Sequence, residues 1–168
     1  MIGVSDFARA AEWRPDAPTR ALAPSEQSLL PPTLAAGVAL NRVRIVMGWH
    51  SPVAAIGRVT IVRGRRIFWA YAPPEALSLA ERAHLAHELT HVWQHMALKR
   101  TGPELLADRR YRYRLAPGKP FVGYGYEQQA AIVEDFVRVT NGAPPRWTSS
   151  APSLSVYEQV IASAVHAS

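Results

Sequence analysis

Apolar residues recur every three to four positions in three stretches of the chain, the spacing of a helix with one buried face. The longest stretch covers Leu79–Lys99, the second covers Tyr126–Thr140, and the third covers Ser153–Ala167. An Asn-Gly pair and two prolines follow the second stretch and favour the end of a helix there. We therefore expect three helices, of which the last packs on the domain as a terminal helix.

Sequence signals mark both ends of the first expected helix. Ser78 and Glu81 have the spacing of a capping box, in which each side chain accepts a hydrogen bond from the other residue's backbone N–H. Lys99 and Arg100 suit the negative end of the helix dipole, and Gly102–Pro103 stops the helix beyond them.

Strand-forming residues precede this helix. Val59–Val62 and Ile67–Tyr71 are rich in β-branched and aromatic side chains, and the Arg-Gly-Arg-Arg segment between them suits a hairpin turn. The alternation over Arg42–Val46 fits either a half-buried strand or the end of a helix. Together with the helices, this pattern predicts an α+β fold whose small sheet, three-stranded or similar, packs on the first helix.

Prolines interrupt the beginning of the chain and predict an arm over residues 1–35 that wraps the domain, with one short helix near Asp6–Trp13. Residues 36–168 are expected to form a single domain, because 168 residues are close to the usual size of one core. Within that domain, 103–124 has the composition of a loop, with a short helical turn around Glu104–Asp108.

The composition narrows the available chemistry. The chain has no cysteine, which excludes a disulfide framework, a thiolate zinc finger, an iron–sulfur site and a cysteine nucleophile. Any bound metal must therefore be held by histidine and carboxylate side chains. The formal net charge is +6, but no run of five basic residues occurs. A solvated basic surface is expected, and a nucleic-acid partner is not.

The N-terminal sequence MIGVSDFARAAEWRPD has no basic segment followed by an apolar one, so no Sec signal is expected. No uncharged apolar run reaches the roughly 18 residues that a membrane helix needs. We expect cytoplasmic synthesis and no membrane partner, and the sequence allows export by a secretion system that reads no N-terminal signal.

The first expected helix carries an H-E-x-x-H motif, His87-Glu88-Leu89-Thr90-His91. At about 100° per residue, two histidines four positions apart differ by about 40° in direction, so both imidazoles reach one ion. Glu88 points to the edge of that face, where it can act as a general base without binding the ion. With 6 His in the chain, composition alone would give about 0.01 such motifs by chance.

The segment HELTHVWQH resembles the active-site helix of zincin metallopeptidases. The resemblance implies that His87 and His91 are Zn²⁺ ligands and that Glu88 is the catalytic base acting on a zinc-activated water. The metzincin pattern HExxHxxGxxH is absent, because Gln94 and Ala97 occupy its Gly and His positions. The resemblance therefore implies a gluzincin-like domain, in which a glutamate from a helix further along the chain is the third ligand.

Two glutamates of the second expected helix compete for this role. Glu127 lies 36 residues after His91, follows a glycine-rich entry, and is followed one turn later by the small Ala131. Glu134 lies seven residues further on the same helical face. We prefer Glu127 as the third ligand, and expect Glu134 or Asp135 to orient a ligand histidine through its other ring nitrogen.

The resemblance covers about residues 55–140 and extends to small bacterial domains carrying HELTHVWQ, some of them encoded near Rhs/Vgr-type secretion systems. It implies zinc-dependent hydrolysis of a peptide or protein substrate lying along the hairpin Val59–Tyr71, and a secretion-system association. The alternative is a degenerate or zinc-stabilised zincin that serves as a binding or adaptor module of such a system.

Further polar side chains near the motif have less defined roles. An oxyanion donor is normally needed for peptide hydrolysis, and Tyr113, Tyr124 and Tyr126 are equal candidates at this point. His84 and His95 share the helical face of the motif, but a straight helix cannot wrap four such side chains around one ion. We expect these two histidines to flank the site.

Overall fold

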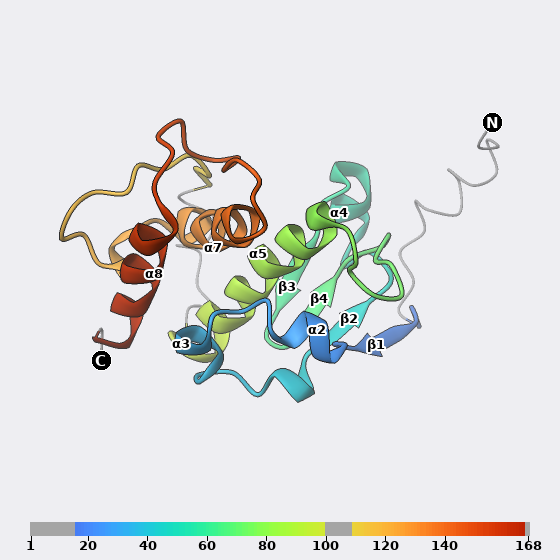
Figure 1. The fold of residues 1–168 in the computed structure, drawn as a ribbon. Coiled ribbons are helices and arrows are strands. Elements are labelled where there is room, and N and C mark those ends of the chain that lie inside the picture. Colours follow the sequence, from blue (N-terminus) through green and yellow to red (C-terminus); the bar gives the residue numbers. More distant parts are fainter. Residues whose placement is uncertain (1–15, 100–108, 167–168) are drawn as a thin grey trace.

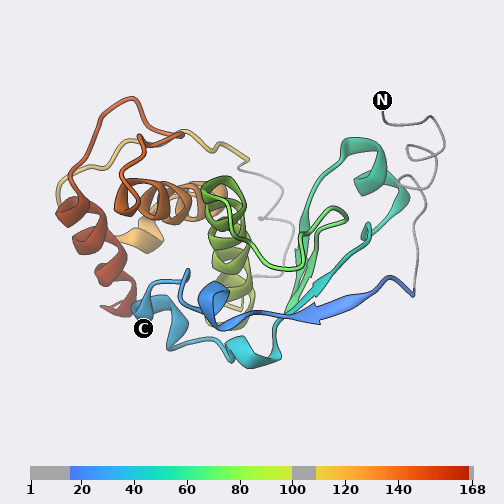
Figure 2. The same ribbon diagram turned by 45° about the vertical axis from the view of Figure 1, so that its right-hand side comes forward.

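A long central helix separates a small sheet on one side from two further helices on the other (Figures 1 and 2). The structure is a computed structural model that describes residues 16–99 and 109–166. The central helix, α5 (Leu79–Met96), contacts strands of the sheet and packs along α7 (Tyr126–Thr140). The fold is α+β, as the hydrophobic pattern predicted.

The sheet has four short strands in the order β1-β2-β4-β3. β3 (Ile61–Arg63) and β4 (Arg66–Phe68) form the predicted antiparallel hairpin, and Gly64 supplies the positive φ of 58° that its turn requires. β2 (Arg44–Val46) pairs in parallel with β4, and β1 (Thr19–Ala21) pairs antiparallel with β2. Among the described residues, β3 is therefore an edge strand of a mixed sheet.

Residues 16–35 of the predicted arm are built into the core. Besides β1 they form two short helices, α2 (Pro24–Gln27) and α3 (Pro32–Ala35), each beginning at a proline whose fixed φ suits the first helical position. Four leucines of this segment are at most 5% exposed: Leu22, Leu29, Leu30 and Leu34. The helix predicted near Asp6–Trp13 lies outside the described residues.

The capping box predicted for α5 is present. The Ser78 hydroxyl accepts a hydrogen bond from the Glu81 N–H at 3.2 Å, and the Glu81 carboxylate accepts one from the Ser78 N–H at 2.9 Å. The helix ends at Met96, three residues before the predicted end, and Lys99 has a left-handed backbone with φ of 52°. The predicted Gly102–Pro103 stop lies outside the described residues.

The remaining elements are short. A 3-10 turn η1 (Leu40–Arg42) leads into β2, and α4 (Pro52–Gly57), which the pattern did not predict, begins at the N-cap Ser51. The segment between α5 and α7 is loop-like where described and contains η2 (Phe121–Gly123). The turn predicted near Glu104–Asp108 lies outside the described residues. The terminal helix is α8 (Leu154–Ala162), which continues into η3 (Ser163–His166).

The core fills the space on both sides of α5. Every residue from 85 to 95 is buried, because the sheet covers one side of the helix and α7 the other. The largest fully buried apolar side chains come from all layers of the fold: Leu30, Leu34, Ile45, Ile67, Leu85, Leu89, Phe121, Ile132 and Tyr157. The HExxH motif lies within this buried stretch, so its polar side chains need partners inside the protein.

Candidate metal centre

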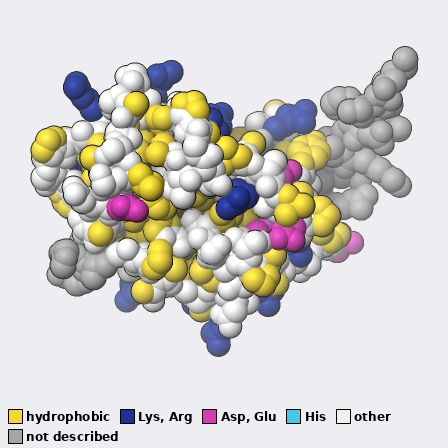
Figure 3. Space-filling model, viewed as in Figure 1, with side chains coloured by type: hydrophobic (Ala, Val, Ile, Leu, Met, Phe, Trp, Pro, Cys, Tyr) yellow, Lys and Arg dark blue, Asp and Glu magenta, His cyan; other side chains and the backbone are white. Residues whose placement is uncertain are grey.

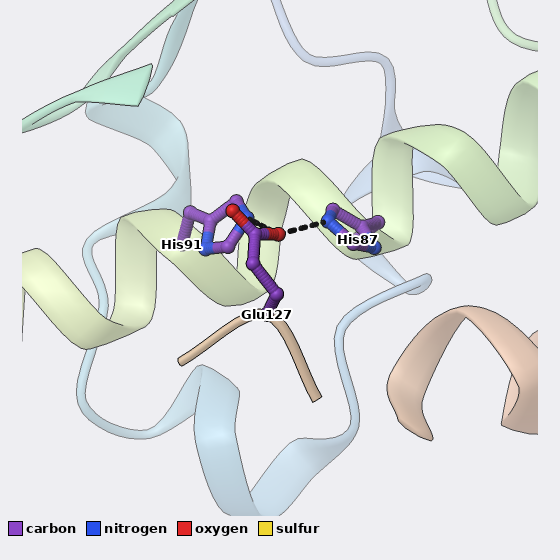
Figure 4. Close-up of side chains that lie close together, drawn as sticks. All are labelled: His87, His91 and Glu127. Atoms are coloured by element: carbon purple, nitrogen blue, oxygen red, sulfur yellow. Dashed lines mark hydrogen bonds and ion pairs between the residues drawn. The ribbon is translucent and has the colours of Figure 1, made fainter. Parts of the chain in front are cut away.

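Three potential ligands converge between α5 and α7 (Figure 4). His87 and His91 come from α5, and Glu127 comes from the first turn of α7; one ligand atom from each lies within 4.8 Å of the others. The Glu127 Oε2 atom is 3.2 Å from the Nε2 atoms of both histidines. All three residues are at most 7% exposed. No described histidine is visible on the face shown in Figure 3.

The donor chemistry suits a divalent metal such as zinc. Two imidazole nitrogens and one carboxylate oxygen, brought together by two packed helices, are the three-ligand set that keeps a fourth coordination position open. Ala130 and Ala131, both fully buried, follow Glu127 by about one turn, and their small side chains permit close packing of the helices. The sequence therefore predicted the grouping of His87, His91 and Glu127 that the fold produces.

Glu134 lies on the other side of His87. Its Oε2 atom is 3.1 Å from the His87 Nδ1 atom, while the Nε2 atom of His87 faces Glu127. The Glu134 carboxylate also accepts hydrogen bonds from the Trp147 Nε1–H at 2.7 Å and from Arg146 at 3.3 Å. As expected, Glu134 orients the histidine through its other ring nitrogen and is separate from the convergent group.

His91 is held in the same way by a residue that sequence reasoning missed. The His91 Nδ1 atom lies 2.7 Å from the Gln94 Oε1 atom, so a proton on Nδ1 leaves the Nε2 lone pair facing Glu127. The Gln94 amide in turn donates to the Tyr126 carbonyl at 2.9 Å and to the Gln129 Oε1 atom at 3.0 Å. Gln94 appeared only as a departure from the metzincin pattern, although its i,i+3 spacing from His91 was a usable signal.

Asp135, the other residue considered for this orienting role, belongs to a separate network. Its carboxylate accepts hydrogen bonds from the Tyr113 hydroxyl at 2.8 Å and from the backbone N–H groups of Arg146 and Trp147. The Tyr113 hydroxyl is also 2.9 Å from that of Tyr157. Asp135 therefore fastens the segment after α7 to the core, and it does not contact a candidate ligand.

Contacts between the carboxylates of Glu127 and Glu134 and the histidines change the pKa values of the triad residues. Burial by itself would lower the pKa of His87, but hydrogen bonds to Glu127 and Glu134 outweigh it and raise that pKa to about 9. Burial would raise the pKa of Glu127, yet its contacts with His87 and His91 hold it well below its usual range. The triad thus keeps carboxylate charge that compensates a positive charge, either a proton on His87 or a metal cation.

Aromatic rings cover the imidazoles. Tyr126 stacks on His91 with ring centroids 4.4 Å apart, and Tyr111 lies nearly parallel to His87 at 5.7 Å. Trp147 also stacks on Tyr111, with ring centroids 4.8 Å apart. These rings restrict the orientations of the histidines, and Tyr111 was another residue that the sequence analysis did not single out.

Only one of the three tyrosines considered as oxyanion donors lines the cavity at the triad. The Tyr113 hydroxyl is committed to its buried network, and the Tyr124 hydroxyl accepts a hydrogen bond from the Ala116 N–H at 3.0 Å. Tyr126 lines the cavity, together with Tyr111. The structure therefore removes Tyr113 and Tyr124 from that role.

Glu88 faces the same cavity without joining the triad. The cavity has a volume of about 130 Å³ and is bounded by the triad, by Glu88 and by residues 59–63 of the edge-strand segment. A Glu88 carboxylate oxygen lies 3.8 Å from the His84 Nε2 atom, which is 3.0 Å from the Thr60 hydroxyl. His84 thus flanks the site as expected, and His95 also lines the cavity outside the triad.

Comparisons with known proteins relate this architecture to a bacterial secretion protein. No protein-family model matches the chain. The type VI secretion system spike protein VgrG2b of Pseudomonas aeruginosa is 41% identical over 68 residues, which cover 35% of this chain and 7% of that protein. The solved effector domain of Pseudomonas aeruginosa VgrG2b superposes with a TM-score of 0.56 and 25% identity, over 82% of this chain and 89% of that domain.

These similarities agree with the predicted resemblance to domains associated with Vgr-type secretion systems. The relative is named as a secretion-system component, which agrees with the signal-independent export that the sequence allows. The chain spans only a small part of the length of the full spike protein. No helix among residues 16–99 and 109–166 has the length and apolarity to cross a membrane.

Proposed function

We propose that this chain is an effector module of a type VI-like secretion system and that it hydrolyses peptide bonds as a gluzincin-like zinc metallopeptidase. The first part rests on the similarity to the VgrG2b effector domain over most of the chain. The second part rests on one observation, the convergence of His87, His91 and Glu127 beside Glu88 in a shared cavity. The substrate is a peptide or protein.

The triad would hold the zinc ion. Its two imidazoles and one carboxylate fit zinc in type and number, and their mutual approach within 4.8 Å leaves room for one ion among them. Bound zinc would polarise the substrate carbonyl and lower the pKa of a water molecule to about 7. Glu134 and Gln94 hold the ligand histidines in the required tautomers.

Glu88 acts as the general base in this proposal. Its carboxylate takes a proton from the attacking water as the water oxygen bonds to the peptide carbon, and passes that proton to the amine that leaves when the C–N bond breaks. Its position in the cavity but outside the triad supports this role. The edge strand β3 offers backbone N–H and C=O groups along which an extended substrate pairs.

A tyrosine hydroxyl donates to the developing oxyanion. Tyr111 and Tyr126 both line the cavity. Burial and the charges of Glu127 and Glu88 raise the pKa of Tyr111 to about 12, and the same causes raise that of Tyr126. Both hydroxyls therefore keep their protons at neutral pH and are able to stabilise negative charge on the substrate oxygen.

A second candidate function comes from the same comparisons. Their names describe a spike protein and its effector domain, which favours a binding or adaptor part of the secretion apparatus. In that function a zinc ion at the triad would only stabilise the fold. A zinc ion that only stabilises the fold needs no base beside it. The buried Glu88 in the cavity is the feature that favours catalysis.

Substitution of Glu88 separates the two functions. We expect Glu88→Gln to keep about one zinc per chain and to reduce cleavage of a broad peptide library by 100-fold or more, since it removes a general base but no ligand. Glu158→Gln, an exposed change on α8, is the matched control. Zinc content is measured by plasma mass spectrometry and cleavage by chromatography.

Each outcome has a distinct meaning. Full activity in Glu88→Gln would contradict the assigned base. Zinc binding without cleavage in the wild-type chain would favour the adaptor function. Wild-type protein without zinc, even after zinc is resupplied, would contradict both.

A further inference from the structure

The net positive charge of this chain comes from one continuous segment. Between Glu26 and Glu75 there is no Asp or Glu, while six arginines occur there: Arg42, Arg44, Arg58, Arg63, Arg65 and Arg66. The formal net charge of the whole chain is +6, so the other residues balance one another. This segment contains α4 and three of the four sheet strands, β2, β3 and β4. Its residues 59–63 also form one wall of the cavity at the triad, which we call the cleft.

Two arginines are among the residues that line the cavity itself. Arg63 lies on the edge strand β3, and Arg109 precedes Tyr111 on the segment that covers His87. Both side chains are exposed, and neither side chain makes a hydrogen bond or ion pair with another residue that the structure describes, although the Arg63 backbone pairs with Arg66 in the sheet. Burial lowers the pKa of His95, and the charges of His91 and Arg63 lower it further, which agrees with an Arg63 charge close to the cavity.

The acidic groups of the cavity do not neutralise these arginines. Glu127 is paired with His87 and His91, and Glu88 is the only other carboxylate among the lining residues described. With a divalent cation at the triad, the cation and the two arginines outweigh the two carboxylates. The cleft is then positive and attracts negative charge, more strongly at low ionic strength.

We propose that this cleft selects peptides with an acidic side chain near the scissile bond, and that Arg63 and Arg109 bind that carboxylate. This inference rests on the proposed function and names its substrate class. An extended peptide paired with β3 would bring alternate side chains past Arg63, since successive residues of a strand point to opposite faces. Nucleic acid fits less well, because single-stranded bases bind by stacking on aromatic rings. The Tyr111 and Tyr126 rings already stack on His87 and His91, which leaves less ring surface for a base.

Binding to zinc-loaded Glu88→Gln protein tests this selectivity without requiring turnover. Two pools of labelled random peptides of equal length, one enriched in Glu and one in Lys, are titrated by fluorescence polarisation. We expect the Glu pool to bind at least about tenfold tighter at low salt, with the preference shrinking as salt is added. Arg63→Ala and Arg109→Ala, each in the Glu88→Gln background, should each reduce the preference by about fivefold.

Arg42→Ala in the same background is the matched control, because Arg42 is exposed in the same acid-free segment but does not line the cavity. It should leave the preference within twofold of the Glu88→Gln parent, and thermal melting verifies that all variants fold. Equal binding of the two pools, or equal losses in Arg42→Ala and Arg63→Ala, would overturn the proposal. So would displacement of the Glu pool by a single-stranded oligonucleotide at lower concentration than by unlabelled Glu peptide.

The design separates this inference from the function on which it rests. If the protein prefers the Glu pool but the wild-type chain cleaves no peptide, the peptidase function is contradicted and the binding of acidic peptides is supported. Cleavage of both pools at equal rates would keep the peptidase and contradict the acidic site.

Discussion

Individual contacts at the triad explain why two buried histidines point in the same direction. His87 is held between Glu134 and Glu127, one carboxylate at each ring nitrogen. His91 is held between Gln94 and Glu127 in the same manner. Each histidine therefore has one nitrogen committed to an orienting partner and the other directed at the convergence point, the arrangement found around protein-bound metals.

The two glutamates of α7 should respond differently to substitution. We expect Glu127→Ala to lose bound zinc, because Glu127 supplies the third convergent atom. Glu134→Ala should retain zinc with affinity weakened by about 10–100-fold, because it removes an orienting partner of His87. Zinc content by plasma mass spectrometry, with competitive chelator titration for affinity, distinguishes them. If Glu127→Ala kept its zinc and Glu134→Ala lost it, Glu134 would be the third ligand and Glu127 would not.

Gln94 offers a test of the orienting contact at His91. Gln94→Leu keeps a similar side-chain size but leaves the His91 Nδ1 atom without its acceptor. We expect zinc affinity to fall by about 10–100-fold in the same chelator titration. Gln159→Leu is the control, since Gln159 is exposed on α8 and does not line the cavity at the triad. Equal affinity in the wild type and Gln94→Leu would show that Gln94 has no part in the site.

Among the elements, α5 takes part in both the candidate site and the packing of the two halves of the fold. It carries the motif, it contacts the sheet on one side, and it packs against α7 on the other. Its hydrophobic pattern is weakly one-sided for that reason, and the capping box at Ser78 was the clearer sequence signal for its start. The residues just before its first turn are linked to the N-terminal segment, because the Ala76 N–H donates a hydrogen bond to Glu26.

Glu26 is a fully buried carboxylate that joins distant elements. It accepts two hydrogen bonds from the Arg20 guanidinium at 2.7 and 2.8 Å, and one from the Ala76 N–H at 2.8 Å just before α5. A further bond comes from the Ala23 N–H at 2.8 Å. Burial raises the pKa of Glu26, but Arg20 and the two N–H groups outweigh it and lower that pKa below its ordinary value.

This lowered pKa predicts acid sensitivity of the fold. The folded chain binds the Glu26 proton more weakly than the unfolded chain, so the stabilisation is present above the unfolded pKa and is lost as pH falls through the folded pKa. At pH 7, Glu26→Gln should lower the free energy of unfolding by about 2–4 kcal/mol, because it replaces charge-assisted hydrogen bonds within a buried pair. Urea unfolding at pH 7 and pH 4 measures both effects.

The Glu26→Gln variant should also lose part of the pH dependence between these two conditions. Glu158→Gln, at an exposed position of α8, is expected to behave like the wild type. An unchanged pH dependence in Glu26→Gln would mean that other carboxylates govern the acid response.

At the scale of the whole molecule, the candidate site lies where the two halves of the fold meet. α5 supplies two of the convergent atoms, α7 supplies the third, and the β3 segment supplies one wall of the cavity (Figure 1). A metal bound at the triad therefore joins two helices that are separated along the chain by residues 97–125. Binding should stabilise the whole fold, since the unfolded chain has no such group of ligands.

Thermal melting tests this coupling. Free zinc at a thousandfold excess over its dissociation constant should add about 4 kcal/mol. For a chain of this size that amounts to a rise in Tm of roughly 8–16 °C. A chelator should reverse the rise, and Glu127→Ala should show none. A Tm that does not respond to zinc in the wild type would contradict a site spanning α5 and α7.

Local sequence signals predicted the elements that depend on neighbouring residues. The β3–β4 hairpin follows from β-branched residues around a glycine turn, and α5 and α7 follow from periodicity and end signals. The arrangement of the sheet was not predictable in this way. β1 pairs with β2, and β2 lies beside β4, through contacts between residues far apart in the chain. The prolines of residues 16–35 favoured the prediction of a peripheral arm, although the leucines of this segment are buried in the core.

The sequence by itself determined the chemistry available to this protein: an HExxH motif on a capped helix, no cysteine, and a glutamate opening a second helix. Spacing within one helix decides which side chains share a face, so His87, His91 and Glu88 could be placed from their numbers alone. Only the tertiary structure decided between Glu127 and Glu134 as members of the convergent group, and brought Tyr111 and β3 to the site. Those relations depend on how the helices and the sheet pack against one another, which the complete core determines.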